Sequence, residues 1–303
     1  MLMHGLRMPP FNTTLMGVLR GVFDYYGMDA SDPMLYGGSG HAFLMNLHEE
    51  LCPSSPYCWN RAGFARLLRN LGVEMVDHGF FHGGPSAAER AAVETLLRAE
   101  IDRGVPCSLL NMENQLITGY DEVGFDTAQP WGPQMDLPPA RLSYGSWVEL
   151  ANEVHVNFFS FPRVEPADDG TIVAESLRYA VDLYLQPNAH TQPPYAVGAG
   201  AWSSWITAVK NGHGRSHGNW WNAMVWSECR SRASEYLSEA SEKQKRFRHL
   251  AALALGYREI GELLAKVSDK SLDAERKIAL LERASVVEAD CIRDIEGSAA
   301  LRI

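Results

Sequence analysis

The chain contains 303 residues, of which 46% are hydrophobic and 21% are charged. This composition is typical of a globular protein and excludes disorder, collagen and coiled coil as descriptions of the whole chain. The formal charge of −10 argues against nucleic-acid binding, which needs a basic surface. No stretch of about 18 apolar residues is present, and the N-terminal residues lack the apolar segment of a signal peptide, so we expect a cytoplasmic protein with no membrane partner.

Helical and strand patterns alternate in the first half of the chain. Apolar residues recur at helical spacing and predict a helix over 14–27, which Gly27 can end. Ser86 and Glu89 form a capping-box pattern at the start of another helix. Further helices are expected at 60–71 and 86–103. A glycine-rich turn is expected at 37–43, before another short helix. Strands are expected at 73–76, 105–111, 115–122 and 154–161. The two central strands are expected to form a hairpin or to be neighbours in an antiparallel sheet.

The second half of the chain is helical in pattern. It follows a proline-containing linker at 162–170. Helices are expected over 171–185, 196–210, 219–240, 244–267 and 271–297, with Ser271 capping the last. We therefore predict an α+β fold with two domains, 1–165 and 166–303, the second all helical and, at roughly 130 residues, large enough for its own core.

The cysteines and histidines give little indication of a disulfide or a metal site. Cys52 and Cys58 could close a small loop, but free thiols are the expected state in a cytosolic chain. No CxxC pair is present, which argues against a structural zinc site. Histidines four residues apart occur in HGFFHGG and NGHGRSHGN, but the glycines around them argue against one helical face. We therefore predict no metal and no cofactor.

Residues 12–43 resemble the start of a papain-like cysteine-peptidase domain. Their sequence, NTTLMGVLRGVFDYYGMDASDPMLYGGSGHAF, is similar to bacteriocin-processing (double-glycine) peptidases and, more closely, to the N-terminal domain of the butirosin-biosynthesis acyltransferase family. In those proteins a nucleophilic cysteine begins the first helix, which ends in a signature matched here by Tyr25, Tyr26 and Gly27. The segment LITGYDE (116–122) matches a strand whose catalytic histidine lies six residues before the glycine. The resemblance covers most of the chain and implies a papain-like domain followed by a helical domain.

Other residues occupy both catalytic positions of this resemblance. Thr14 stands where the nucleophile is expected and Glu113 where the histidine is expected, and the first cysteine of the chain is Cys52. A Cys–His pair that could activate a thiolate is therefore missing. Cys107 is predicted to lie in a strand, away from the helix N-terminus that activates such thiols. Ordinary thiol-protease chemistry is not expected.

Glu113 has two interpretations. The resemblance implies that it faces a cleft near the leading end of the first helix, where a buried carboxyl can act as a general acid or base. The alternative is a solvent-exposed glutamate at the tip of a hairpin. The amides of Asn114 and Gln115 could hold a substrate carbonyl or an oxyanion. In an extended strand, Glu113 and Gln115 point the same way and Asn114 points the opposite way.

Thr14 also has two interpretations. It could be a substitute nucleophile, which requires an adjacent base because a hydroxyl is weakly nucleophilic at neutral pH. Alternatively, Thr13 or Thr14 simply caps the helix over 14–27, and this is the preferred interpretation. Both threonines would lie at a helix N-terminus, where a developing negative charge on a substrate is favoured.

Weaker candidates for substrate binding occur in both halves. His41 follows a glycine-rich turn, with a packed or solvated loop histidine as the alternative. Asp126 and Trp131 lie where relatives carry an orienting acid and an aromatic wall, although no imidazole is present to orient. Trp202 and Asn222 belong to a tryptophan-rich region that either packs as a core or lines a pocket.

These patterns predict a small-molecule enzyme of specialised (natural-product) metabolism. It would use a papain-like cleft without a Cys–His pair for acyl, amide or rearrangement chemistry. Glu113 would be the general acid or base and Thr14 the second catalytic residue. The alternative is a non-catalytic pseudo-peptidase that binds a ligand or a partner. An apolar stripe over 250–267 could pack on the first domain or on a second subunit, which leaves a homodimer open.

Overall fold

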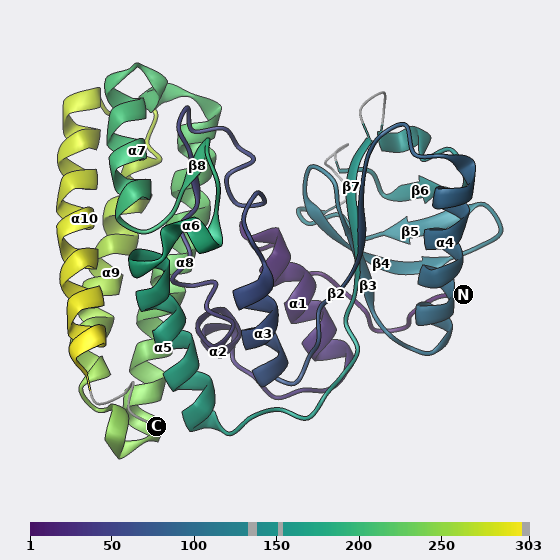
Figure 1. Cartoon of the computed structure of the whole chain (residues 1–303), viewed down its shortest axis with the longest axis horizontal. Coiled ribbons are helices and arrows are strands. Elements are labelled where there is room, and N and C mark those ends of the chain that lie inside the picture. The colour runs from purple at the N-terminus through teal and green to yellow at the C-terminus, as the bar shows by residue number, and fades with distance from the viewer. Residues whose placement is uncertain (133–137, 151–153, 299–303) are drawn as a thin grey trace. The chain divides into compact units, whose positions relative to one another are not determined.

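The computed structural model describes residues 1–132, 138–150 and 154–298 of the chain. The fold is α+β, with an antiparallel sheet and a helical C-terminal region (Figure 1). Contacts divide the chain into two compact units. Unit 1 comprises Met1–Ala30 and Gly72–Pro166, and unit 2 comprises Ser31–Leu71 and Ala167–Ile303. Within the described ranges, no helix combines the length and the hydropathy that a membrane span requires.

Unit 1 is built on a six-stranded sheet with the strand order β2-β7-β3-β4-β5-β6. The strands are β2 (Val76–Gly83), β3 (Cys107–Leu110), β4 (Asn114–Tyr120), β5 (Gly124–Thr127), β6 (Arg141–Ser143) and β7 (Val154–Ser160). Leu110 pairs with Asn114 in antiparallel register, which confirms the hairpin between the two central strands. The strand expected at 73–76 was placed too early, because Val73 makes only an isolated bridge and the regular strand begins at Val76.

Two helices accompany the sheet of unit 1. Helix α1 (Thr14–Tyr25) contacts β4 and buries the apolar stripe predicted from its sequence. Gly21 lets this helix approach the N-terminal segment, since a Cβ there would lie 2.1 Å from the carbonyl oxygen of Arg7. Helix α4 (Ala87–Asp102) begins with the predicted capping box, in which Ser86 and Glu89 exchange side-chain and backbone hydrogen bonds.

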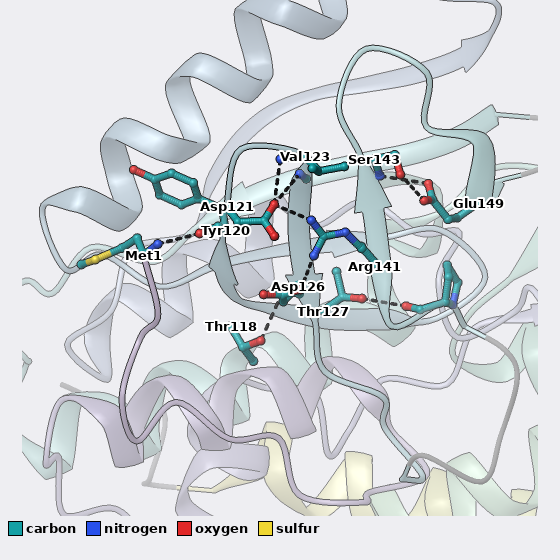
Figure 2. A network of polar contacts seen from close by, with 12 residues as sticks. Met1, Thr118, Tyr120, Asp121, Val123, Asp126, Thr127, Arg141, Ser143 and Glu149 are labelled. Atoms are coloured by element: carbon teal, nitrogen blue, oxygen red, sulfur yellow. Dashed lines mark hydrogen bonds and ion pairs between the residues drawn. The ribbon is translucent and has the colours of Figure 1, made fainter.

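A polar network joins the outer strands of this sheet (Figure 2). Arg141 on β6 forms an ion pair with Asp126 on β5 at 2.7 Å and a second one with Asp121 in the β4–β5 turn. The amino group of Met1 donates a 2.6 Å hydrogen bond to the carbonyl oxygen of Tyr120. Asp126 therefore pairs with an arginine of the neighbouring strand.

Unit 2 is mainly helical. Its elements are α2 (Asp32–Gly38), α3 (Ala62–Asn70), α5 (Asp169–Leu185), α6 (Pro187–His190), α7 (Ala199–Lys210), α8 (His217–Lys243), α9 (Leu250–Val267) and α10 (Ala274–Gly297), with short strands β1 (Leu47–His48) and β8 (Tyr195–Ala196). The two strands pair antiparallel, and α9 contacts both α8 and α10 (Figure 1). The five long helices predicted in the second half are present, with shifted ends.

Two local expectations in unit 2 are wrong. Residues 37–43 are not a turn before a helix, because Gly37 and Gly38 end α2. A Cβ at Gly37 would lie 2.0 Å from the ring of Tyr236, so glycine permits close contact between α2 and α8. Ser271 does not cap the last helix. The side chain of Asp273 does so by accepting a 2.8 Å hydrogen bond from the Arg276 backbone N–H.

The compact units differ from the sequential division at 165/166 in the placement of residues 31–71. These residues group with the second half because α2 contacts α5 and α8, and α3 contacts α5. Helices α2 and α3 bury apolar side chains that the sequence assigned to the first domain, including Leu35 and Phe64.

Candidate functional site

Thr14 and Glu113 are in direct contact in unit 1. The Thr14 hydroxyl donates a 2.7 Å hydrogen bond to Glu113 Oε2. Thr14 is the first residue of α1 and is 1% exposed, and Glu113 is 9% exposed. The two residues that the sequence analysis singled out as catalytic candidates therefore lie within hydrogen-bond distance, although 99 positions separate them in the chain.

The shape of the β3–β4 hairpin places Glu113 at the leading end of α1. Residues 111–113 connect the two strands, and the Asn111 backbone N–H donates to the carbonyl oxygen of Glu113 at 3.3 Å. Met112, at 60% exposure, forms the exposed tip of the hairpin. The hairpin-tip interpretation of Glu113 is therefore wrong, because this carboxyl folds back against the helix. The dipole of a helix favours a negative charge near its N-terminus.

Asn114 completes the contacts of the Thr14 hydroxyl. Its backbone N–H and its Nδ2 lie 3.2 and 3.3 Å from Thr14 Oγ1 and donate to it. The oxygen thus donates once and accepts twice, which uses the full hydrogen-bonding capacity of a hydroxyl. The preferred interpretation of Thr14 as a helix cap is wrong. Thr13 occupies the N-cap position, and it too makes no side-chain capping hydrogen bond.

Gln115 is turned away from Thr14. Its Nε2 donates to the carbonyl oxygens of Ala128 and Pro139, both at 2.8 Å, and the residue is fully buried. The expectation that Glu113 and Gln115 point the same way while Asn114 points opposite is wrong, because Glu113 precedes the regular strand. Gln115 forms hydrogen bonds with the segment after β5 and does not lie beside the Thr14 hydroxyl.

The remaining candidates of unit 1 are less informative. Trp131 lies half-buried in the connection between β5 and β6. Thr13 is 3% exposed and its carbonyl oxygen accepts from the backbone N–H groups of Met16 and Gly17.

His41 lies in the core of unit 2. Its ring is stacked on Trp226 and meets the edges or faces of Trp59, Phe64 and Tyr36. Burial lowers its pKa to about 3, so the imidazole is neutral at physiological pH. Its Nδ1 lies 3.6 Å from the Sγ of Cys229. The packed-histidine alternative describes this environment.

Trp202 belongs to a buried polar cluster of unit 2. Its Nε1 donates to Glu288 Oε2 at 2.7 Å, and the hydroxyl of Tyr184 donates to the same oxygen at 2.5 Å. Arg230 Nε lies 2.6 Å from the other oxygen of Glu288. This tryptophan therefore packs in the helical core, which is the first of the two interpretations given for the tryptophan-rich region.

Asn222 holds a loop of unit 2 against α8. Its Nδ2 donates to the carbonyl oxygens of Leu51, Cys52 and Gly218, and its Oδ1 accepts from Trp226 Nε1 at 3.2 Å. Every polar atom of this side chain is thereby engaged within the protein. Asn222 is a structural residue for the loop that follows β1.

A cavity in unit 2 contains residues that the sequence did not single out as a site. It has a volume of about 430 Å³ and lies between the loop after β1 and the segment from α6 to β8. Its lining residues carry no formal charge; they are Cys58, Trp59, Asn60, Asn188, Ala189, Thr191, Gln192, Pro193 and Tyr195. The Cys52–Cys58 spacing was the available sequence signal, but nothing in the sequence connects it with Tyr195.

Comparison with known proteins does not indicate a function, so the function is inferred from the geometry described above. No family model matches the chain, and no curated protein matches it. Among the described residues, no three histidine, cysteine, aspartate or glutamate side chains meet as candidate metal ligands. The Thr14–Glu113 pair and the cavity beside Cys58 are the two candidate sites that we develop further.

Proposed function

We propose that unit 1 contains a papain-like domain and that the protein is a cytoplasmic small-molecule enzyme of specialised metabolism. Glu113 acts as its general acid or base, in acyl, amide or rearrangement chemistry. The observation that carries this proposal is the 2.7 Å hydrogen bond from the Thr14 hydroxyl to Glu113. The pair stands where the family pattern has a nucleophile and its base, at the start of a helix that packs on the sheet.

The contacts of Glu113 support an acid–base role. Thr14 fixes one carboxylate oxygen, so the orientation of the carboxyl is set before substrate arrives. Such preorganisation is what a proton-transferring group requires. Glu113 is more exposed than Thr14, at 9% against 1%, so proton transfer to a bound molecule needs less rearrangement at Glu113 than attack by Thr14 does.

Thr14 would act as a nucleophile only in an acyl-transfer reaction. The Thr14 oxygen would attack the substrate carbonyl, its proton would pass to Glu113, and the leaving group would then take that proton. The amide of Asn114, released from Thr14 Oγ1, could donate to the carbonyl oxygen as it becomes negative. In a rearrangement, Thr14 would instead be the residue that positions Glu113.

A second candidate function is a non-catalytic pseudo-peptidase that binds a ligand or a partner. The observation that favours it is the saturated hydroxyl of Thr14, with one hydrogen bond donated and two accepted. Such an arrangement is also how a buried polar group ties a helix to a strand. The two candidate functions differ in whether Glu113 exchanges a proton with a bound molecule.

The substitution Glu113→Gln separates these candidates. Glutamine keeps the size of the side chain and an oxygen that accepts from Thr14, but it cannot exchange a proton. Turnover of a panel of p-nitrophenyl esters and p-nitroanilides is the readout, together with the melting temperature. For an enzyme we expect turnover to fall by about 10²-fold or more, with the melting temperature nearly unchanged.

Glu149→Gln is the matched control in the same unit. Glu149 also accepts hydrogen bonds from a hydroxyl and a backbone N–H, both of Ser143, but lies outside the proposed site. Turnover should be retained in this variant. Equal turnover in Glu113→Gln and the unsubstituted protein would reject the acid–base role. Turnover by neither protein, with substrate analogues still bound, would favour the pseudo-peptidase.

A further inference from the structure

Two cysteines and two hydroxyl groups form a chain of contacts beside the cavity of unit 2. The Ser54 hydroxyl donates to the Sγ of Cys52 at 3.0 Å and lies 2.8 Å from the hydroxyl of Tyr195. Tyr195 in turn shares a side-chain hydrogen bond with Cys58. Cys58 and Tyr195 both line the cavity. This dithiol cluster, consisting of Cys52, Ser54, Cys58 and Tyr195, is separate from the Thr14–Glu113 pair.

The hydroxyls of Ser54 and Tyr195 link the two thiols of the dithiol cluster. Ser54 donates to Cys52, and either hydroxyl can be the donor in the contact between Ser54 and Tyr195. Besides burial, the hydrogen bond with Cys58 raises the pKa of Tyr195, which is the effect of a hydrogen bond that the tyrosine donates. A chain of hydrogen bonds therefore connects Cys58, Tyr195, Ser54 and Cys52. When the pair of thiols has lost one proton, shifts along this chain can place the negative charge on either sulfur.

Tyr195 is suited to remain protonated within this chain. Burial, followed by the hydrogen bond with Cys58, raises its pKa to about 12. A tyrosine that is neutral throughout the physiological pH range can donate a proton to one side and accept one from the other. A hydroxyl that donates to a thiolate stabilises it, because hydrogen bonds to charged acceptors are the stronger ones.

The two cysteines also differ from the other three in accessibility. Cys58 is exposed and Cys52 is partly exposed, whereas Cys107, Cys229 and Cys291 are buried. The loop that carries Cys52 and Cys58 is held by Asn46, whose Nδ2 donates to the carbonyl oxygens of Ser55 and Cys58 at 2.7 and 3.0 Å. Oxidants in solution therefore reach Cys58 first, and the same loop carries the second thiol.

We propose that the dithiol cluster is a site of oxidation by small hydroperoxides, with Cys58 as the attacking thiol and Cys52 as the resolving thiol. The Cys58 sulfur attacks one peroxide oxygen, the O–O bond breaks, and the leaving alkoxide or hydroxide takes a proton supplied through Tyr195. The products are a sulfenic acid on Cys58 and an alcohol or water. The Cys52 sulfur then attacks the Cys58 sulfur, the S–O bond of the sulfenic acid breaks, and a disulfide forms while the hydroxide leaves as water with the proton of the Cys52 thiol.

The peroxide is the only oxidant that this reaction requires. The two thiols lose two protons and two electrons, and the peroxide, as the oxidant, accepts them. The uncharged lining of the cavity suits hydrogen peroxide and neutral organic hydroperoxides better than a charged oxidant. An accessible thiol with a resolving partner close by is the usual arrangement in thiols that respond to peroxide.

The test is peroxide treatment of the full chain followed by tryptic peptide mass spectrometry. Cys52 and Cys58 fall in one tryptic peptide, bounded by Arg20 and Arg61, so a disulfide between them lowers its mass by two hydrogens. We expect this product at low hydrogen peroxide concentration and its reversal by dithiothreitol. In Cys52→Ser, the reaction should stop at a sulfenic acid on Cys58 that dimedone labels.

Tyr195→Phe tests the hydrogen-bonded chain. Its oxidation rate should fall about tenfold, which is the effect of losing one hydrogen bond to a charged group. Cys291→Ser, which removes a buried thiol of α10, should leave the rate and product unchanged. Thiols at 52 and 58 that stay fully alkylatable after peroxide treatment would overturn the proposal. So would a Cys58 sulfenic acid that persists in the unsubstituted chain as it does in Cys52→Ser.

Discussion

Arg230 and Glu288 form an ion pair in the interior of the helical unit. Arg230 Nε lies 2.6 Å from Glu288 Oε1, and the two side chains are 1% and 2% exposed. Arg230 also donates to the carbonyl oxygens of Ala42 and Leu44, which lie in the loop after α2. The pair thus links α8, α10 and that loop through charged hydrogen bonds.

Breaking this pair on one side should destabilise the protein strongly. Glu288→Gln leaves the Arg230 charge buried without a counter-charge, and we expect the free energy of unfolding to fall by about 3–5 kcal/mol. Urea denaturation measures the change. The double variant Arg230→Met/Glu288→Gln should lose less than Glu288→Gln alone, because no buried charge remains. A larger loss in the double variant would contradict this account, and Arg283→Met, in an exposed pair with Glu259, should change stability little.

His41 should make the stability of unit 2 sensitive to mild acid. Its pKa is about 3 in the folded chain against an ordinary value of 6.5, chiefly because it is buried. Below pH 6.5 the unfolded chain binds a proton that the folded chain does not, so stability falls as pH decreases towards 3. The expected slope is about 1.4 kcal/mol per pH unit.

The His41→Phe variant should reduce this pH dependence, since phenylalanine suits the surrounding rings and does not titrate. Urea denaturation at pH 7, 6 and 5 gives the slope for each protein. His217→Gln, an exposed residue of α8, serves as the control and should keep the original slope. An identical slope in His41→Phe and the original chain would assign the effect to other groups.

The Thr14 hydroxyl should contribute to stability whether or not it takes part in catalysis. Thr14→Val removes the group that contacts Glu113 and Asn114 and leaves both without this partner in a buried environment. We expect a loss of about 1–3 kcal/mol in the free energy of unfolding. Thr14→Ser, which keeps the hydroxyl, should retain most of the stability. Thr207→Val, at an exposed position of α7, should stay within about 0.5 kcal/mol.

Glu94 should be a stabilising residue of the sheet unit. Its Oε1 accepts from the Gly145 backbone N–H at 2.7 Å and from Trp147 Nε1 at 2.9 Å, and Trp147 has a positive φ of 48°. Glu94→Leu leaves both donors unpaired, and we expect a loss on the order of 3 kcal/mol in urea denaturation. Glu94→Gln preserves an acceptor oxygen and should lose clearly less. Equal losses in the two variants would mean that these hydrogen bonds do not hold the Gly145–Trp147 turn.

Local patterns in the sequence predicted the elements of the fold well. The repeat of apolar residues in α1 and the Ser86–Glu89 box of α4 depend only on neighbours within one helical turn, so both are legible from the chain. The β3–β4 hairpin is equally local. Predictions that required a second element were less accurate. The close approach of α2 to Tyr236 of α8 requires the glycine at position 37, and the capping role expected of Thr14 was replaced by a hydrogen bond to a distant carboxylate.

By itself, the sequence determined the α+β class and the helical second half. The tertiary structure decided that Thr14 and Glu113 touch and that the hydroxyls of Ser54 and Tyr195 link Cys52 with Cys58. The physical reason is that helix and turn patterns arise from interactions between neighbouring residues. A side-chain hydrogen bond across about a hundred residues depends on how whole elements pack, which no local pattern encodes.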